Sequence, residues 1–335
     1  MDAPRPNGSP AIELLRESSA PTEPTEPEPL LESREPSMAM LLEQLRRAAA
    51  GDSTILITGE SGTGKDVLAR QTHKWSPRRQ GPLVVISCTT FAEHLLEDEL
   101  FGHVRGSFTG AVTDKAGRFE AADGGTVLLD EMAELPVALQ KRFLHFLQER
   151  SFERIGSDRT VKLDVRVIAT SSRNLEVEVT AGRFRQDLFY RLNVINFALP
   201  PLRERVRDIL PLADQMLRNI SLATGRPGLT LTNDAAASLI AYRWPGNIRE
   251  LRNAMMRAAA LAQSDRVDLL DLPELVGRPE ELSHAPGSHG ASLKEFERDH
   301  IIRVLAKSRT LSQAAATLGI NVTTLWRKRR YYGIG

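Results

Sequence analysis

The chain has 335 residues, and its 44 lysines and arginines nearly balance 43 aspartates and glutamates, which leaves a formal net charge of +1. A uniformly basic protein is excluded, so any surface for nucleic acid must be local. No apolar run approaches the ~20 residues that cross a bilayer. The one cysteine excludes an internal disulfide and a cysteine-rich zinc site. The N-terminus lacks a signal-peptide pattern, so we expect a cytoplasmic protein.

Residues 1–36 differ in composition from the rest of the chain. They hold eight of the 19 prolines, and eight acidic residues outnumber three basic ones. Such a segment buries too little apolar surface to offset its chain entropy, which predicts a disordered tail. The alternative is a docking segment for a partner, with Ile12, Leu14 and Leu15 as its anchors.

Residues 37–205 alternate between short apolar runs and amphipathic segments. A helical spacing of apolar residues opens this region at 38–50. Nearly continuous β-branched runs are typical of parallel strands buried on both faces, and we expect strands at 54–57, 83–86, 126–129, 165–169 and 194–199. Helices are expected between them, at 67–73, 138–148 and 184–192. This alternation predicts a parallel α/β sheet.

Strand signals stop after Pro200 and Pro201. A helical subdomain is predicted at 206–276, with helices at 208–223, 232–242 and 247–262. Glycines and prolines then mark a linker at 277–290. Residues 291–335 form a last unit of three short helices.

A glycine-rich loop follows the first expected strand and precedes a helix. It consists of Gly59, Glu60, Ser61, Gly62, Thr63, Gly64 and Lys65. In this context the loop's backbone N–H groups cradle phosphates, and Lys65 reaches their β and γ oxygens. The alternative, a turn without a ligand, is disfavoured by the flanking strand and helix. Asp66 follows where a hydroxyl usually coordinates Mg²⁺, and its carboxylate could hold the ion through water or point away.

Two adjacent carboxylates, Asp130 and Glu131, end the buried run at 127–129. Phosphoryl transfer needs one carboxylate for Mg²⁺ and a polar group that orients water. We expect Asp130 to hold the magnesium shell and Glu131 to polarise the attacking water, with Mg-ATP as the nucleotide. A solvated acidic loop is the alternative, and the phosphate loop argues against it.

Longer motifs resemble one family, the AAA+ activators of the bacterial sigma factor sigma-54, also called enhancer-binding proteins. The resemblance covers residues 37–333. Besides the phosphate loop and the acidic pair, the matching blocks are 99–103, 106–111, 124–126, 184–193, 199–205 and 244–251. The resemblance implies an AAA+ ATPase at 37–205 with its helical lid at 206–276.

The resemblance assigns contact with sigma-54 to one surface loop. Its residues are Gly106, Ser107, Phe108, Thr109, Gly110 and Ala111. The glycines permit a bend, and an exposed Phe108 is costly unless it binds a partner. The alternative is a Phe108 side chain folded back onto the core. The family usually has Ala where this chain has Ser107, a small change.

Three arginines match family residues that act on the nucleotide. Arg185 and Arg191 resemble arginines that are presented to the neighbouring subunit's ATP, where they stabilise charge on the γ-phosphate. Without the resemblance they would be interpreted as helix-surface residues. Arg249 matches the lid arginine that senses the γ-phosphate. The resemblance thus implies self-association into a ring, commonly a hexamer, and leaves open whether the ring is mixed.

Besides Asp66, two motifs depart from the family pattern. Ser87 replaces an Asn that holds the catalytic Glu, and we expect the shorter side chain not to reach Glu131. The end of the sensor strand, commonly Thr-Asn, is Ser171-Ser172, which can donate to a phosphate or water with less reach. With Asp66, these changes motivate one alternative: a low-turnover nucleotide- and DNA-binding co-activator in a mixed oligomer with an active paralogue. A remodeller unrelated to sigma-54 is a second alternative, disfavoured by the Phe108 loop.

The last unit, residues 291–335, carries nine basic residues against three acidic ones. A helix at 311–318, a turn at 319–321 and a helix at 322–331 predict a helix-turn-helix. It resembles the Fis-type DNA-binding domain, whose recognition helix would present Thr323, Thr324, Trp326, Arg327, Lys328, Arg329 and Arg330. The alternative is a solvated basic tail, which would lack the small core supplied by Ala314, Ala315, Leu318, Ile320 and Leu325.

The predicted fold is an AAA+ P-loop parallel sheet with a helical lid, followed by a small all-α helix-turn-helix domain. The predicted function is a bacterial transcription activator that binds enhancer DNA and uses ATP hydrolysis to open the closed sigma-54 RNA polymerase complex. A receiver domain needs about 100 residues. Because only residues 1–36 precede the ATPase, we expect no receiver domain. We expect control to come from the expression level, from a separate regulatory protein or from truncation of a longer parent.

Overall fold

The computed structural model describes residues 32–89, 93–226, 228–274, 276, 301, 305, 310–317 and 320–332. The linker predicted at 277–290 and most of the tail predicted at 1–36 lie outside these residues. The chain divides into two units, residues 1–279 and residues 280–335, and we describe each by itself.

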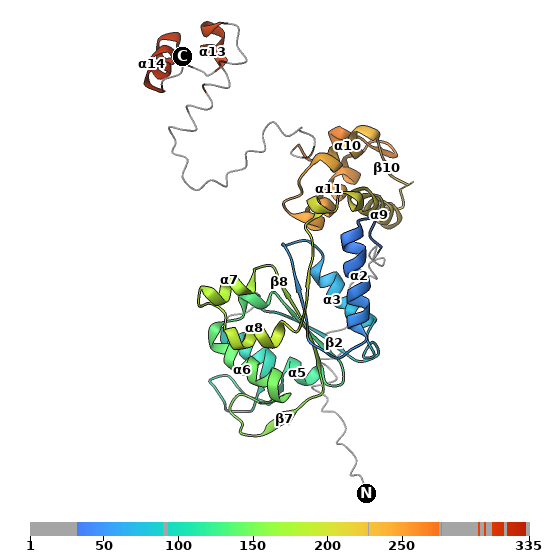
Figure 1. The fold of residues 1–335 in the computed structure, drawn as a ribbon, viewed down its shortest axis with the longest axis vertical. Helices are drawn as coiled ribbons and strands as arrows, with labels where there is room; N and C mark the ends of the chain where they lie inside the picture. Colours follow the sequence, from blue (N-terminus) through green and yellow to red (C-terminus); the bar gives the residue numbers. More distant parts are fainter. Residues whose placement is uncertain are drawn as a thin grey trace. The chain divides into compact units, whose positions relative to one another are not determined.

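Parallel strands form the central sheet of the first unit (Figure 1). Among the described residues, the strand order is β2-β5-β8-β1-β9. Their bounds are β1 Ile55–Thr58, β2 Leu83–Ser87, β5 Thr126–Asp130, β8 Arg166–Ser171 and β9 Ile195–Ala198. All five strands predicted from the sequence are confirmed. Thr58 pairs with Ser171 and Ser87 with Asp130, so the carboxyl ends of these strands meet at one edge.

Helices cover both faces of this sheet (Figure 1). They are α2 Pro36–Ala49, α3 Lys65–Lys74, α4 Glu93–Phe101, α5 Arg118–Ala121, α6 Val137–Glu149, α7 Leu175–Thr180 and α8 Gln186–Leu192. Side chains alternate along each strand. In β1, therefore, Ile55 and Ile57 pack with α2 and α3, whereas Leu56 belongs to the core on the opposite face.

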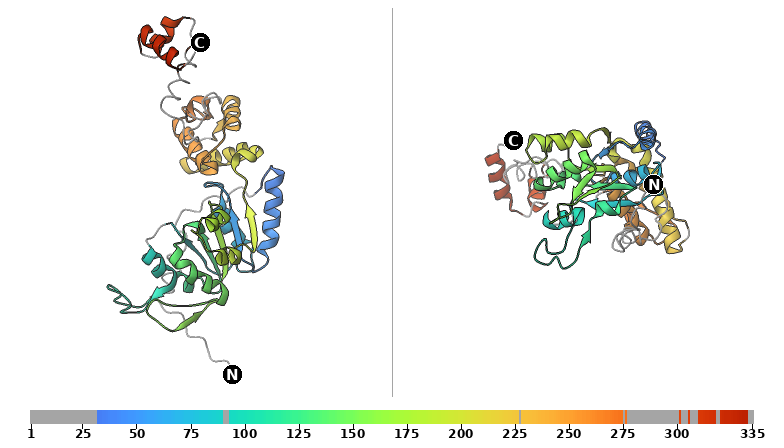
Figure 2. Two further views of the ribbon diagram at one scale, coloured as in Figure 1. Left: turned by 60° about the vertical axis from the view of Figure 1, so that its left-hand side comes forward. Right: turned by 90° about the horizontal axis from the view of Figure 1, so that it is seen from below.

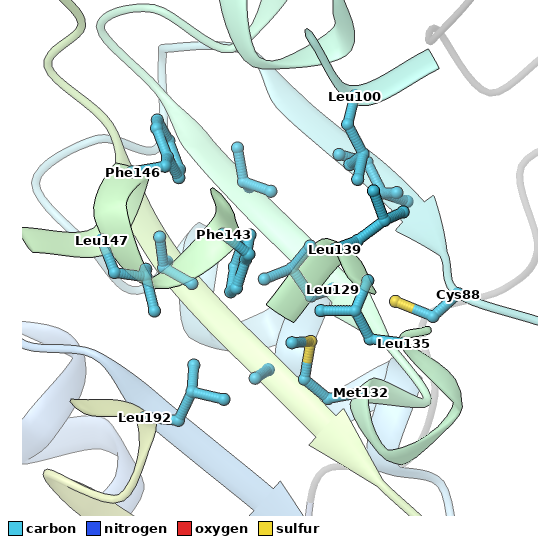
Figure 3. Packing of buried hydrophobic residues seen from close by; sticks show 14 of the residues in the cluster. Cys88, Leu100, Leu129, Met132, Leu135, Leu139, Phe143, Phe146, Leu147 and Leu192 are labelled. Carbon is cyan, nitrogen blue, oxygen red and sulfur yellow. The ribbon is translucent and has the colours of Figure 1, made fainter. Parts of the chain in front are cut away.

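That second core lies beneath α6 (Figure 3). Phe143, Phe146 and Leu147 project from one side of α6, at the spacing of an amphipathic helix, and are buried against the strands. Cys88 belongs to the same core, and burial raises the pKa of its thiol to about 12. The thiol therefore stays neutral at physiological pH and acts as a small apolar side chain.

Two antiparallel hairpins interrupt the alternation of strands and helices, and neither was predicted. One pairs β3 Gly102–His103 with β4 Lys115–Ala116, and the other pairs β6 Ser151–Glu153 with β7 Thr160–Lys162. The backbone joins them, because Val104 N–H donates to Ile155 O at 3.1 Å and Ile155 N–H donates to Gly102 O at 2.9 Å. The loop at 104–114 between β3 and β4 extends away from the sheet (Figure 2).

The helical subdomain follows β9 within the first unit. Its helices are α9 Val206–Thr224, α10 Asn233–Ala241 and α11 Asn247–Leu261. They pack around Trp244, which is fully buried and donates from Nε1 to Leu239 O at 2.9 Å. The expectation that strands stop after Pro201 is wrong in detail: β10 Thr230–Leu231 and β11 Arg266–Val267 form a short parallel pair, which is too brief to give a periodic signal.

In the second unit the structure describes α13 Leu311–Thr317 and α14 Val322–Tyr332. Among the side chains that the structure describes here, Ala314, Ala315 and Leu325 are buried and pack with Ile301. Leu305, Ile320 and Tyr332 lie against this core. Leu318 and the turn residue at 319 lie outside the described residues. The described part thus contains the two helices and the small core that a helix-turn-helix requires.

Candidate active site

The phosphate loop lies between β1 and α3, at the carboxyl edge of the sheet. Gly59, Gly62 and Gly64 all have positive φ, at 148°, 79° and 96°. A Cβ on Gly62 would lie 2.4 Å from Gly246 O, so only glycine fits there. The ammonium of Lys65 is buried within the loop and donates to Gly59 O at 3.0 Å and to Glu60 O at 3.1 Å. The loop therefore combines a positive charge with the N-terminus of a helix, as an anion site does.

The two carboxylates at the end of β5 lie beside this loop. Asp130 Oδ1 accepts a hydrogen bond from Thr170 Oγ1 at 2.6 Å. Glu131 has left-handed backbone angles, φ 57° and ψ 57°, a conformation that costs roughly 1–2 kcal/mol for a side chain of this kind. Its Oε1 lies 3.6 Å from Lys65 Nζ. The strained turn thus places a carboxylate next to the lysine of the phosphate loop.

Ser172 fixes the other oxygen of this carboxylate. Glu131 Oε2 accepts from the N–H of Ser172 at 2.8 Å and from its Oγ–H at 2.6 Å. Ser87, in contrast, pairs its hydroxyl with Thr89 Oγ1 at 2.9 Å. Ser172 therefore reaches Glu131 although it is shorter than the Asn that the family resemblance implies at this position, and it supplies the orientation that Ser87 does not.

Two other predicted site residues, Ser171 and Asp66, do not point toward Glu131 as Ser172 does. The Ser171 hydroxyl donates to Arg173 O at 2.7 Å, so it turns toward the following loop. Asp66 is exposed in the first turn of α3, where a negative charge suits the helix dipole. Thr170, which the sequence reasoning missed, bonds both carboxylate residues, since it also accepts from Glu131 N–H at 3.1 Å. Its position just before the sensor serines was the available signal.

The lid and the segment that leads into it contribute side chains to the phosphate loop. Arg249 donates from Nη1 to Ser61 Oγ at 2.8 Å. Arg205 donates from Nη2 to Thr63 O at 2.8 Å, and Asn247 donates from Nδ2 to Ser61 O at 3.0 Å. Sequence reasoning assigned Arg249 but missed Arg205 and Asn247, although both lie in the motif blocks 199–205 and 244–251.

A cavity of about 380 Å³ opens next to Thr63 and Gly64. It lies between α2, α3 and the lid helices α9 and α11, and its volume is that of a small-molecule site. The wall is largely apolar, with contributions from Met38, Val67, Met216, Ile220, Ile248 and Met256. An apolar cavity beside an anion-binding loop fits a nucleotide, with the base in the cavity and the phosphates on the loop.

The loop at 104–114 presents Phe108 at the surface. Its side chain is 46% exposed, and its ring meets His103 edge-on with centroids 5.0 Å apart. The Phe108 side chain is therefore neither fully exposed to solvent nor folded back into the core. His103 in turn bonds Asp98, and Lys115 bonds Asp98 and Glu99, so charged groups fix the base of the loop. Thr109, Gly110 and Gly106 are exposed in the same loop.

In the second unit, α14 begins with a side-chain cap. Asn321 Oδ1 accepts from Thr324 N–H at 2.7 Å, which satisfies a free donor of the first turn. Trp326 is 54% exposed, and the guanidinium of Arg330 lies 5.7 Å from its ring centre. Thr323 and Arg327 are exposed too, whereas Lys328 and Arg329 are half-buried. The helix thus carries basic and aromatic groups on its accessible surface.

Comparisons with known proteins agree with this geometry. A family model described as the sigma-54 interaction domain matches residues 31–198, one described as the AAA+ ATPase lid domain matches 203–288, and one described as bacterial regulatory protein, Fis family, matches 292–332. The alginate biosynthesis transcriptional regulatory protein AlgB of Pseudomonas syringae is 48% identical over 306 residues, which are 91% of this chain and 67% of AlgB. The chain belongs to the sigma-54-dependent transcriptional activators.

Other members of the family support the same assignment. The response regulator protein FleR of Pseudomonas aeruginosa is 50% identical over 238 residues, which are 71% of this chain and 50% of FleR. The crystal structure of NtrX from Brucella abortus in complex with ADP aligns with a TM-score of 0.70 and 33% identity, over 96% of this chain and 73% of NtrX. NtrX in complex with ATP aligns with a TM-score of 0.69. An ATP-binding AAA+ domain and a Fis-type helix-turn-helix are therefore present.

In this activator, Arg185 is the N-cap residue of α8 and Arg191 lies in its last turn. Arg185 pairs with Asp187 at 2.7 Å, and hydrogen bonding to Arg185 lowers the pKa of Asp187. Arg191 donates from Nη2 to Leu147 O at 3.1 Å. Both are exposed, as residues that act on another subunit must be, and their action in trans stays a prediction.

The donor set suits magnesium that is bound together with a nucleotide. Among the described residues, no group of three or more His, Cys, Asp or Glu side chains could hold a metal by itself. Magnesium commonly uses one or two carboxylates together with phosphate oxygens and water. Asp130 is placed to supply such a carboxylate. In the described part of the chain, no helix combines the length and the apolar character needed to span a membrane.

Proposed function

We propose that this activator hydrolyses Mg-ATP in a self-assembled ring and uses the energy to convert the closed sigma-54 RNA polymerase complex into the open one. The observation that carries the proposal is the placement of Glu131, which lies beside the phosphate-loop lysine and is oriented by Ser172. A carboxylate held at this position can polarise an attacking water.

Each site residue receives a role in this proposal. The loop from Gly59 to Lys65 binds the phosphates, and Asp130 holds the magnesium, which neutralises phosphate charge when it is bound. Glu131 accepts a proton from water, with Ser172 as its orienting donor. Arg249 responds to the γ-phosphate from the lid. Ser171 and Asp66 lie at the periphery of the proposed nucleotide site.

Contacts beyond the nucleotide complete the proposal. Arg185 and Arg191 act on the ATP of a neighbouring subunit, most simply in a hexamer. The residues from Gly106 to Ala111 contact sigma-54, and the helix α14 binds enhancer DNA in the bacterial cytoplasm. Its residues Thr323, Thr324, Trp326 and Arg327 lie at the start of the recognition helix, and Lys328, Arg329 and Arg330 bind mainly phosphates. We also propose the domain boundaries that the sequence predicts, including the linker at 277–290.

The test is the Mg-ATP hydrolysis rate of the full chain as a function of protein concentration. Specific activity should rise steeply with concentration, because arginines from a second subunit complete each site. Glu131→Gln keeps the size of the side chain but loses the proton acceptor, and it should lower kcat by about 100-fold or more. A wild-type rate no higher than that of Glu131→Gln at any concentration would contradict the proposal and favour the low-turnover co-activator.

A further inference from the structure

The outer side of the phosphate loop is bonded to the lid through its backbone. Three consecutive carbonyls accept hydrogen bonds from three different residues that follow the sheet. Ser61 O accepts from Asn247 Nδ2 at 3.0 Å, Gly62 O from Ile248 N–H at 2.9 Å, and Thr63 O from Arg205 Nη2 at 2.8 Å. No carbonyl in this stretch is therefore left to face solvent or the nucleotide.

These bonds also set the direction of the loop's N–H groups. In a planar trans peptide, the N–H points opposite to the C=O of the same unit. When the lid holds the carbonyls of residues 61–63 outward, the N–H groups that follow them point inward. Thr63 N–H is bonded within the loop itself, since it donates to Glu60 O, the same carbonyl that accepts from Lys65 Nζ. The inward side is where phosphates bind.

Asn247 makes several of the hydrogen bonds between the lid and the phosphate loop. It is completely buried, and both ends of its amide are bonded. Its Oδ1 accepts from Leu202 N–H at 2.7 Å, while its Nδ2 donates to Ser61 O and also to Glu60 Oε2 at 3.2 Å. The backbone has φ 52°, a left-handed conformation that Asn tolerates better than most residues. An amide can meet these demands, because it carries both a donor and an acceptor.

Arg203 reinforces this contact from the exposed side. Its two guanidinium nitrogens donate to the two oxygens of Glu60 at 2.8 and 2.7 Å. These bonds hold the pKa of Glu60 below its usual value, so the carboxylate stays ionised. Both side chains are more than 40% exposed, and such pairs contribute less than buried ones. The buried Asn247 is therefore expected to dominate.

The backbones themselves are in contact at this place. A Cβ on Gly62 would lie 2.4 Å from Gly246 O and 3.1 Å from the Cβ of Arg249. Because the loop packs directly on the start of α11, a shift of the lid must move the loop or break its hydrogen bonds.

We infer that Asn247 is a positioning residue that holds the phosphate loop in its nucleotide-binding conformation and couples nucleotide affinity to the position of the lid. The inference rests on the nucleotide binding of the proposed function. It assigns no contact between Asn247 and the nucleotide. Asn247 acts through the backbone of residues 61–63.

The test compares the full chain with its Asn247→Asp variant. Asp keeps the shape, the acceptor oxygen and the tolerance of positive φ, and it replaces the donor to Ser61 O and Glu60 Oε2 with an acceptor. The dissociation constant of a fluorescent ADP analogue should rise at least tenfold. In steady-state hydrolysis, KM for ATP should rise while kcat at saturating ATP stays within threefold. Glu131→Gln should show the reverse, a loss of kcat with KM retained.

A lid variant that does not touch the loop serves as the matched control. Thr232→Ala removes the side-chain cap of α10, because Thr232 Oγ1 accepts from Ala235 N–H. It should lower the melting temperature without changing the affinity for ADP. If Asn247→Asp behaves in the same way, Asn247 is only a structural residue of the lid and the inference is overturned.

Two further outcomes keep the test decisive. If Asn247→Asp does not fold, Asn247→Gly replaces it, because glycine accepts the φ of 52° and removes the hydrogen bonds at both ends of the side-chain amide. An ADP affinity at least tenfold weaker supports the inference, and an unchanged affinity overturns it. If the wild-type chain itself does not bind the ADP analogue, the proposed function fails. Wild-type binding with equal binding by the variants refutes the inference alone.

Discussion

At the scale of single residues, the site depends on how one carboxylate is held. Glu131 takes a left-handed backbone conformation, and its two oxygens face Lys65 and Ser172. When Lys65 binds phosphate, Ser172 remains as the donor that fixes the orientation of the carboxylate. From the sequence, Ser172 is a shorter side chain than the family pattern implies. In the structure it is nevertheless the direct hydrogen-bond partner of Glu131, the proposed catalytic group.

We expect Ser172→Ala to lower kcat for ATP by about tenfold, since a hydrogen bond to a charged group contributes about 1.5–3 kcal/mol and part of that remains through the backbone N–H. KM should change little, because Ser172 touches Glu131 and not the phosphate loop. Steady-state hydrolysis measures both constants. Ser172→Thr keeps the hydroxyl and should restore the rate. An unchanged kcat in Ser172→Ala would contradict the role.

At the scale of elements, the turn between α10 and α11 joins the lid core to the phosphate loop. Tyr242 lies in this turn, against Trp244, and donates to Glu250 Oε1 at 3.0 Å. Glu250 in turn accepts from Gly246 N–H at 2.8 Å, just before the residues that bond the loop. Burial, together with the hydrogen bond to Glu250, raises the pKa of Tyr242 to about 12.

This raised pKa predicts how the lid responds to alkali. A tyrosine in an unfolded chain ionises near pH 10. The folded chain therefore holds its proton more tightly, and the stability from this group is present below about pH 10 and lost as pH rises toward 12. Tyr242→Phe should lower the free energy of unfolding by about 1 kcal/mol at pH 8. The difference between the two proteins should shrink toward pH 12. Urea unfolding at several pH values tests this, and a constant difference would contradict it.

At the scale of the whole molecule, nucleotide chemistry and partner contact are assigned to different parts of the chain. The proposed catalytic carboxylate of Glu131 follows β5, whereas Phe108 lies in the loop between β3 and β4. A substitution in that loop can therefore remove partner contact without touching the nucleotide site. The helix-turn-helix belongs to a separate unit, which is expected to bring the ATPase near its target on DNA.

We expect Phe108→Ala to keep ATP hydrolysis within about twofold and to lower sigma-54-dependent transcription by about tenfold or more, as the loss of an aromatic anchor does at an interface. Hydrolysis and open-complex formation on a sigma-54 promoter should be measured on the same preparation. Val112→Ala, also in this loop and 76% exposed, is the matched control for loss of apolar surface. Full activation by Phe108→Ala with intact ATPase would show that the sigma-54 contact is wrongly assigned.

The sequence determined those features that are encoded locally. Buried strands, the glycine loop with Lys65, the carboxylates after β5 and the helix-turn-helix each depend on residues within a short stretch, so composition and spacing suffice to predict them. Longer motifs then indicated the family. The hairpins β3–β4 and β6–β7 and the short β10–β11 pair were missed, because strands of two or three residues have no usable period.

Only the tertiary structure decided which distant residues meet. Ser172 and Glu131 are 41 residues apart, and Asn247 and Ser61 are 186 residues apart, so no local pattern can pair them. The parallel sheet brings the first pair together, because the carboxyl ends of β5 and β8 share one edge. The packing of α11 on the phosphate loop brings the second pair together, and it also forms the cavity between α2, α3 and the lid. These contacts depend on how the helices and strands pack. That packing is a property of the complete fold, and no short stretch of sequence encodes it.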